Sequence, residues 1–246
     1  MNIISFDKIT KDYKTGFRKR KTALKDFSLN IVEGEAFGFL GPNGAGKSTA
    51  IKILLNLIFP TAGKAEILGK DVGDKGIRKF IGYLPENPYF YDYLNPVELL
   101  KFAGKTSGMD SFKIKERTEE LLNTVGLWNE RKRAIRSYSK GMVQRTGLAL
   151  ALIHDPKVVI LDEPMTGLDP IGRRQVIELI LKLKSEGKTI FFSSHILEDI
   201  ERVCDRIGIL VNGVLRRVID FKNEQLVKSL EDTFIEEVDK AGGLQQ

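Results

Sequence analysis

Short apolar stretches recur along the chain and predict the strands of a β-sheet. Over 3–13 and 23–31 apolar and polar residues roughly alternate, which predicts two antiparallel strands joined by a basic turn at Arg18 to Lys21. Several of the other stretches are apolar throughout, as is typical of parallel strands covered on both faces. These further strands are expected at 35–40, 65–68, 81–84, 158–161, 189–193 and 207–211.

Helical periodicity predicts helices between and after these strands. Residues 47–58 are apolar around most of the helix circumference, so we expect a buried helix after the strand at 35–40. Between 95 and 154 apolar residues recur on one helix face, which predicts a helical insert. From about residue 221 mixed charge indicates a terminal helix and a frayed tail. The pattern as a whole is that of an α/β fold.

The composition narrows the class of protein. A chain of 246 residues with 42% hydrophobic and 29% charged residues is expected to form one large globular domain with a smaller insert. No run of about 18 apolar residues is present, so membrane contact is expected only through a partner. The net charge of +6 suits a nucleotide binder or an anionic membrane surface, whereas the basic turn favours a solvated loop tip. Cys204 is the single cysteine, which excludes an internal disulfide and agrees with a reducing cytoplasm.

A glycine-rich turn between the strand at 35–40 and the helix at 47–58 carries the strongest motif. It matches G-x-x-x-x-G-K-[ST], in which backbone N–H groups and a helix N-terminus surround phosphates. The glycines let the backbone curl, Lys47 places a positive charge on the outer phosphates, and Ser48 offers a hydroxyl to Mg²⁺. A chance match is expected on the order of once in a hundred chains of this length. The predicted phosphate-binding residues are Gly41, Pro42, Asn43, Gly44, Ala45, Gly46, Lys47, Ser48 and Thr49.

Polar residues follow two of the other predicted strands. Asp162 and Glu163 end the strand at 158–161, and His195 follows the strand at 189–193. Because open α/β sheets bind ligands at the carboxyl ends of their strands, we expect Asp162 to hold Mg²⁺ and Glu163 to orient and deprotonate the attacking water. His195 is a candidate contact to the γ-phosphate. The alternatives are a polar turn for the carboxylates and a helix cap or packed ring for His195.

From about Phe6 to Asp220 the sequence resembles the ATP-binding-cassette family. The segment 138–142, Tyr-Ser-Lys-Gly-Met, is similar to the family signature usually written L-S-G-G-Q, although only Ser139 and Gly141 match it. Gly-Leu-Asp-Pro at 167–170 resembles the D-loop, with Asp169, and His195 resembles the switch histidine. Without the family, Ser139 is a helix cap before the amphipathic run 142–153.

The resemblance also implies a fold and further site residues. The implied fold is a P-loop NTPase (RecA-like) core with a mixed sheet, an N-terminal antiparallel β subdomain and an inserted helical subdomain. The nucleotide-binding domain is expected at 1–222, with the helical subdomain at about 92–154 and a C-terminal helix and tail at 223–246. Tyr13 resembles the aromatic residue that stacks on adenine, with Phe17 as a rival. Glu86 replaces the Q-loop glutamine and is a further candidate ligand of Mg²⁺.

The family resemblance implies an ATPase that uses ATP and Mg²⁺ and is coupled to transmembrane transport. Two cassettes would stack around ATP and drive separate permease subunits from the cytoplasmic side of the inner membrane. Glu86, the Gly-Leu-Asp-Pro segment and the ending 230–234 resemble the ABC-2-type exporter subgroup. The alternative is a soluble single-cassette ATPase, for example in iron-sulfur cluster assembly, with a nucleotide kinase as a remote possibility; no nucleic acid partner is expected. The transported substrate is not readable, since membrane subunits choose it.

Four aromatic residues follow Glu86 in a segment that reads as a loop. They are Tyr89, Phe90, Tyr91 and Tyr93. Exposed aromatic residues commonly anchor partners. In the family this neighbourhood receives a short helix from the membrane subunit, so these side chains are expected to line that socket. Packing in the interior between the two subdomains is the alternative interpretation.

Overall fold

The structure is a computed structural model that describes residues 1–16, 19–223 and 228–242. Phe17 and Arg18, the adenine-stacking rival and one member of the basic turn, lie outside the described residues. The end of the predicted tail, 243–246, lies outside them too. By its contacts the chain divides into two compact units, residues 1–77 with 191–246 and residues 78–190.

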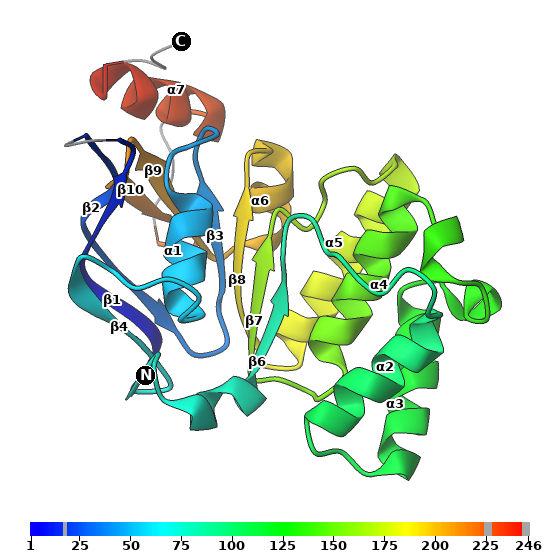
Figure 1. The fold of residues 1–246 in the computed structure, drawn as a ribbon. Helices are drawn as coiled ribbons and strands as arrows, with labels where there is room; N and C mark the ends of the chain where they lie inside the picture. The colour runs from blue at the N-terminus through cyan, green and yellow to red at the C-terminus, as the bar shows by residue number, and fades with distance from the viewer. Residues whose placement is uncertain (17–18, 224–227, 243–246) are drawn as a thin grey trace. The chain divides into compact units, whose positions relative to one another are not determined.

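Among its described residues, the first unit contains one four-stranded sheet, four strands of a second sheet and three helices (Figure 1). One sheet has the order β2-β1-β4-β5 and is antiparallel; in the other, β10, β9, β3 and β8 follow one another, with β3 parallel to β9 and β10 antiparallel to it. Two residues of β8 precede the unit's boundary. The strands are β1 (Asn2–Lys14), β2 (Arg20–Val32), β3 (Ala36–Leu40), β4 (Ala62–Ile67), β5 (Lys70–Asp71), β8 (Thr189–Ser194), β9 (Arg206–Val211) and β10 (Val214–Asp220), and the helices are α1 (Lys47–Leu54), α6 (Leu197–Val203) and α7 (Leu230–Lys240).

Five phenylalanines form the core between these two sheets. Phe6 and Phe27 come from the antiparallel sheet, and Phe37, Phe39 and Phe191 come from β3 and β8. Their ring centroids lie 5.0–6.4 Å apart in tilted and edge-on pairs. Such pairs add stability beyond the apolar area that they bury. The antiparallel subdomain is therefore fastened directly to the strand that leads into the glycine-rich turn.

The second unit consists of two parallel strands and a set of helices (Figure 1). β6 pairs with β7 in register, Ile81 with Val158 through Leu84 with Leu161. Side-chain caps fix four helix starts: Asn95 in a capping box with Glu98, Asp110, Ser139 and Asp169. The elements are β6 (Ile81–Leu84), α2 (Pro96–Thr106), α3 (Ser111–Thr124), α4 (Lys140–Leu152), β7 (Val158–Asp162) and α5 (Pro170–Ser185), with 3₁₀ turns at Trp128–Glu130 and Ile135–Ser137; another, Lys75–Phe80, spans the boundary of the units.

The α/β fold class is confirmed, with corrections at some element ends. The helix predicted over 47–58 is α1, which stops at Leu54, because Asn56 adopts a left-handed backbone conformation with φ 54°. Leu57, which we had placed in that buried helix, is instead exposed. The sequence pattern does not predict the strand β10, because apolar and polar residues alternate only weakly over Val214–Asp220. The terminal helix α7 starts at Leu230 rather than near residue 221. Ser229 caps this start, because its side-chain oxygen accepts a hydrogen bond from the Asp232 N–H.

Gly82 marks a close approach in the second unit. A Cβ added there would lie 2.2 Å from the Ala151 carbonyl oxygen and 2.8 Å from Cγ of Pro156. We expect Gly82→Ala to lower the free energy of unfolding by about 1–3 kcal/mol, because backbone has to move to admit the methyl group. Urea denaturation measures this; the control Gly16→Ala, with no atom within 4 Å of its Cβ position, should leave the midpoint unchanged. Equal midpoints for the two variants would contradict the packing.

Candidate functional site

The glycine-rich turn between β3 and α1 is curled as a phosphate-binding loop requires. Gly44 and Gly46 have φ values of 80° and 112°, in the region that favours glycine. A Cβ on Gly46 would lie 2.5 Å from the Ala23 carbonyl oxygen, and one on Gly41 would lie 2.4 Å from the Leu210 carbonyl oxygen. The loop therefore depends on glycine both for its curvature and for its fit against β2 and β9.

Lys47 is the first residue of α1 and is buried. Its Nζ donates hydrogen bonds to the carbonyl oxygens of Gly41 and Pro42, the latter at 3.4 Å. The loop backbone thus holds the ammonium group close to the N-terminus of α1. A positive charge beside a helix N-terminus attracts anions, because the helix dipole and the first backbone N–H groups act in the same direction.

A turn that we had not singled out in the sequence supports this loop. Asn212 and Gly213 join β9 to β10 with φ values of 50° and 75°. The Gly213 N–H donates to the Ala45 carbonyl oxygen at 2.9 Å, and the Gly213 carbonyl oxygen accepts from the Lys25 N–H at 2.9 Å. The signal was present as Asn-Gly, the commonest dipeptide of a tight hairpin turn. Its role as a brace depends on tertiary packing and was not readable.

The other two sequence candidates in the first unit lie at strand ends. Tyr13, near the end of β1, is 38% exposed, and Lys11 Nζ lies 5.2 Å from its ring centroid. Tyr13 is therefore not fully buried among core residues. His195 directly follows β8 and is exposed, two residues before α6 begins.

In the second unit, the paired strands bring Glu86 and Asp162 to one edge. Leu84 lies opposite Leu161, so both carboxylates follow at the carboxyl ends of neighbouring parallel strands. Burial, reinforced by the charges of Asp162 and then Glu86, raises the pKa of the Tyr83 hydroxyl to about 12. Asp162 is buried and Glu86 is exposed. The Tyr83 hydroxyl therefore keeps its proton at neutral pH.

Glu163 occupies an uncommon backbone conformation for its residue type. Its φ is 50°, in the left-handed region, and it is buried directly after β7. Its carbonyl oxygen accepts from the Thr166 N–H at 3.1 Å, which closes a tight turn. Non-glycine residues in this region are concentrated at functional sites, where the surroundings maintain the strain.

The signature-like segment and the D-loop-like segment lie side by side in the second unit. A Cβ on Gly141 would lie 3.3 Å from Cδ2 of Leu168. Each segment starts a helix: Ser139 accepts from the Met142 N–H at 3.3 Å, and Asp169 accepts from the Gly172 N–H at 2.7 Å. Ser139 is therefore a helix cap, the alternative that its sequence position alone predicts, and Asp169 is a helix cap too.

The family model described as ABC transporter matches residues 24–166. This chain belongs to the ABC transporter family. A relative in Synechocystis sp., an uncharacterized ABC transporter ATP-binding protein, is 50% identical over 218 residues, which cover 87% of this chain but only 62% of the relative. The chain thus spans less than two thirds of that relative's length.

Other comparisons agree on the cassette. The lantibiotic transport ATP-binding protein SrtF of Streptococcus pyogenes is 40% identical over 215 residues, covering 87% of this chain and 90% of SrtF. A solved dimeric ATP-binding cassette in a post-hydrolysis state, bound to ADP and Pi, has a TM-score of 0.84 and 27% identity over 90% of this chain and 100% of that one. The predicted family and fold are therefore confirmed.

Oxygen donors that suit Mg²⁺ occur in each of the two units. Among the described residues, no three His, Cys, Asp or Glu side chains are grouped to hold a metal by themselves. Mg²⁺ that binds together with a nucleotide needs fewer protein ligands, because phosphate oxygens and water complete its coordination shell beside one or two carboxylates. Ser48 in the first unit carries a hydroxyl oxygen, and Asp162 and Glu86 in the second unit carry carboxylate oxygens, which are donors of the type that Mg²⁺ prefers.

Glu86 stands where the family resemblance expects the Q-loop glutamine, and the charge of its carboxylate allows a test. Without metal, its carboxylate opposes a triphosphate, whereas Mg²⁺ compensates it. We expect Glu86→Gln to raise ATP affinity measured without Mg²⁺ about fivefold, which corresponds to about 1 kcal/mol, and to shift the Mg²⁺ titration of phosphate release. Glu116→Gln, an exposed carboxylate on α3, is the matched control. An unmoved titration in Glu86→Gln excludes the role.

Proposed function

We propose that this cassette binds ATP with Mg²⁺ and hydrolyses it to ADP and phosphate to drive transport by separate membrane subunits. The observation that carries the proposal is the curled loop, in which Gly44 and Gly46 adopt left-handed conformations and Lys47 is held at the N-terminus of α1. A loop of this shape offers backbone N–H groups and a buried cation to phosphate oxygens.

Each site residue is given one role in this proposal. The loop and Lys47 hold the phosphates, Tyr13 stacks on adenine, and His195 contacts the γ-phosphate. Ser48, Asp162 and Glu86 hold Mg²⁺, which when bound neutralises charge on the phosphates. Glu163 orients the attacking water and accepts its proton, which requires the carboxylate form. Ser139, Gly141 and Asp169 complete the site of a second cassette. The domain limits 1–222, 92–154 and 223–246 belong to the same proposal.

The partners follow from the cassette's own architecture and its relatives. Within the described residues no helix is long and apolar enough to cross a bilayer, so a permease must supply the path. The similarity to a lantibiotic transport protein favours an exporter acting at the cytoplasmic side of the inner membrane. A solved relative of this cassette is a dimer, which supports two cassettes closing on ATP. Nothing in the comparisons favours the soluble alternative.

Three tyrosines after Glu86 provide a candidate contact for the permease. Tyr89, Tyr91 and Tyr93 are 94%, 61% and 65% exposed, and the rings of Tyr91 and Tyr93 lie 5.9 Å apart. Phe90 differs, because it packs toward Gly147 on α4. Exposed tyrosines are frequent anchors of protein interfaces. We propose that these three tyrosines receive the membrane subunit and that Phe90 fixes their segment to α4.

Removing the proposed base should separate binding from hydrolysis. We expect Glu163→Gln to keep ATP affinity within about twofold, because the amide preserves shape, and to lower turnover by at least about 100-fold, since no base remains. ATP should then trap a dimer, seen as a shift on a sizing column. Glu178→Gln, an exposed acid on α5, is the control. A Glu163→Gln variant that turns over normally would refute the assignment.

Truncating the exposed tyrosines should uncouple ATP hydrolysis from transport. We expect the double variant Tyr91→Ala with Tyr93→Ala to retain ATPase activity as an isolated subunit and to lose most transport in the assembled complex, because the anchor is gone. Phe112→Ala, at an even more exposed aromatic residue (80%), is the matched control and should transport normally. Loss of thermal stability in the double variant would show that these side chains serve packing instead.

A further inference from the structure

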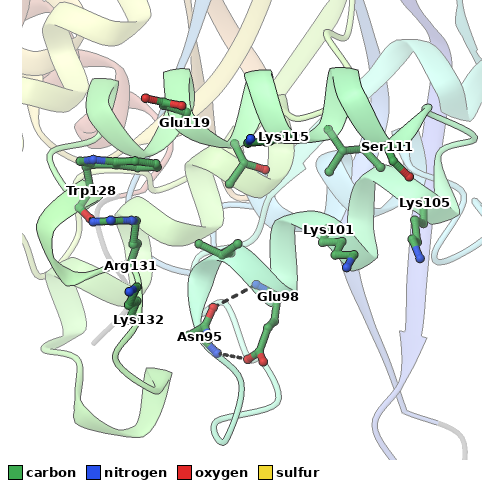
Figure 2. Close-up of a pocket in the computed structure, with 13 residues that line it drawn as sticks. Asn95, Glu98, Lys101, Lys105, Ser111, Lys115, Glu119, Trp128, Arg131 and Lys132 are labelled. Atoms are coloured by element: carbon green, nitrogen blue, oxygen red, sulfur yellow. Dashed lines mark hydrogen bonds between the residues drawn. The ribbon is translucent and has the colours of Figure 1, made fainter.

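A groove of about 610 Å³ runs between α2 and α3 in the second unit (Figure 2). Its far ends are marked by Lys105 on α2 and by Trp128 in the turn after α3. The proposed ATP site and the three exposed tyrosines contribute none of its lining residues. The residues that line it are Asn95, Val97, Glu98, Lys101, Lys105, Ser111, Ile114, Lys115, Thr118, Glu119, Trp128, Arg131 and Lys132.

The floor of the groove is apolar and firmly built. α2 and α3 approach closely at Gly104, where an added Cβ would lie 2.6 Å from Cγ1 of Ile114. Val97, Ile114 and Trp128 supply apolar surface, and the capping box of Asn95 with Glu98 fixes the start of α2, as the dashed lines in Figure 2 show. A floor of this kind favours apolar side chains that are presented from one face.

The rim of the groove carries an excess of positive charge. Five cations line it against two carboxylates, and Glu98 is already engaged with the Asn95 N–H at 2.9 Å. Among the described residues, the ammonium groups of the lysines at 101, 105, 115 and 132 form no ion pair or hydrogen bond. Their charges are therefore available to a partner.

One end of the groove is preorganised for a carboxylate. The Arg131 guanidinium stacks over the Trp128 ring, 4.1 Å from its centroid, and its Nη1 donates to the Trp128 carbonyl oxygen at 2.7 Å. The stacking and this bond restrain the planar fork, while further N–H donors remain on it. Ordering the arginine in advance reduces the entropic cost of binding.

We propose that this groove is a docking site for an acidic amphipathic helix of a partner protein. The cations come from three segments rather than from one point: Lys101 and Lys105 from α2, Lys115 from α3, and Arg131 and Lys132 from the turn after Trp128. For scale, α2 alone is about 16 Å long for its 11 residues. A single phosphate or lipid head group would reach only one part of this set. A helix with apolar residues at i, i+3, i+4 and i+7 and carboxylates beside them matches both the floor and the rim.

Trp128 makes the groove directly observable, because it is the only tryptophan of the chain. The probe is a synthetic helical peptide of about 18 residues, with leucine on one face, glutamate on both flanks and no tryptophan. Titrated into the full chain without nucleotide, it should change Trp128 emission saturably, and added salt should weaken the binding. A peptide of the same composition in scrambled order should bind at least tenfold more weakly.

Charge reversal at neighbouring positions of one helix provides the decisive comparison. Lys115 lines the groove whereas Lys113 does not, and both lie on α3. We expect Lys115→Glu to weaken peptide binding on the order of tenfold and Lys113→Glu to change it less than twofold; Lys101→Glu is a second groove variant. Equal losses at 113 and 115, or a Trp128 response to phosphatidylglycerol vesicles but not to the peptide, would overturn the proposal. ATP binding stays unchanged in all variants, so this test is independent of the proposed function.

Discussion

The structure depends on how closely backbone approaches backbone around the glycine-rich loop. At Gly41 and Gly46 even a methyl group would collide with a carbonyl oxygen, of Leu210 and Ala23 respectively. Strands far apart in the sequence thus form the wall against which the loop is shaped. The loop's curvature in turn orients its backbone and the Lys47 ammonium, so the phosphate chemistry rests on a packing constraint rather than on side-chain variety.

Backbone packing also positions the acidic residues of the second unit. Parallel pairing of β6 with β7 brings two strand ends level, and the carboxylates that follow them share Tyr83 as a neighbour. Glu163 adds a strained backbone, which the surrounding buried turn maintains. Charge, proton affinity and strain are therefore concentrated where the strands end, as expected for sheets of this class.

The second unit also presents two surfaces of different chemistry. The exposed tyrosines at 89, 91 and 93 are neutral and aromatic, whereas the groove between α2 and α3 has an apolar floor and a cationic rim. Surfaces that differ in this way select different partners. Aromatic anchors bind partners of complementary shape, whereas a cationic rim binds partners of complementary charge. A cassette of this size can thus be held by more than one contact while the phosphate loop remains in the other unit.

The sequence by itself determined the family, the strand and helix order and the phosphate motif, because these follow from periodicity and from residue types at fixed local spacing. Even there, α1 ends earlier than its apolar residues predict, because of the backbone conformation of Asn56, and the strand β10 is not predicted. Only tertiary structure decided the rest. The brace from Gly213 to Ala45 and the pairing that brings Glu86 and Asp162 to one edge join segments distant along the chain, and the groove depends on how α2 packs on α3. Local sequence patterns do not predict such contacts, because they depend on how the elements pack in three dimensions.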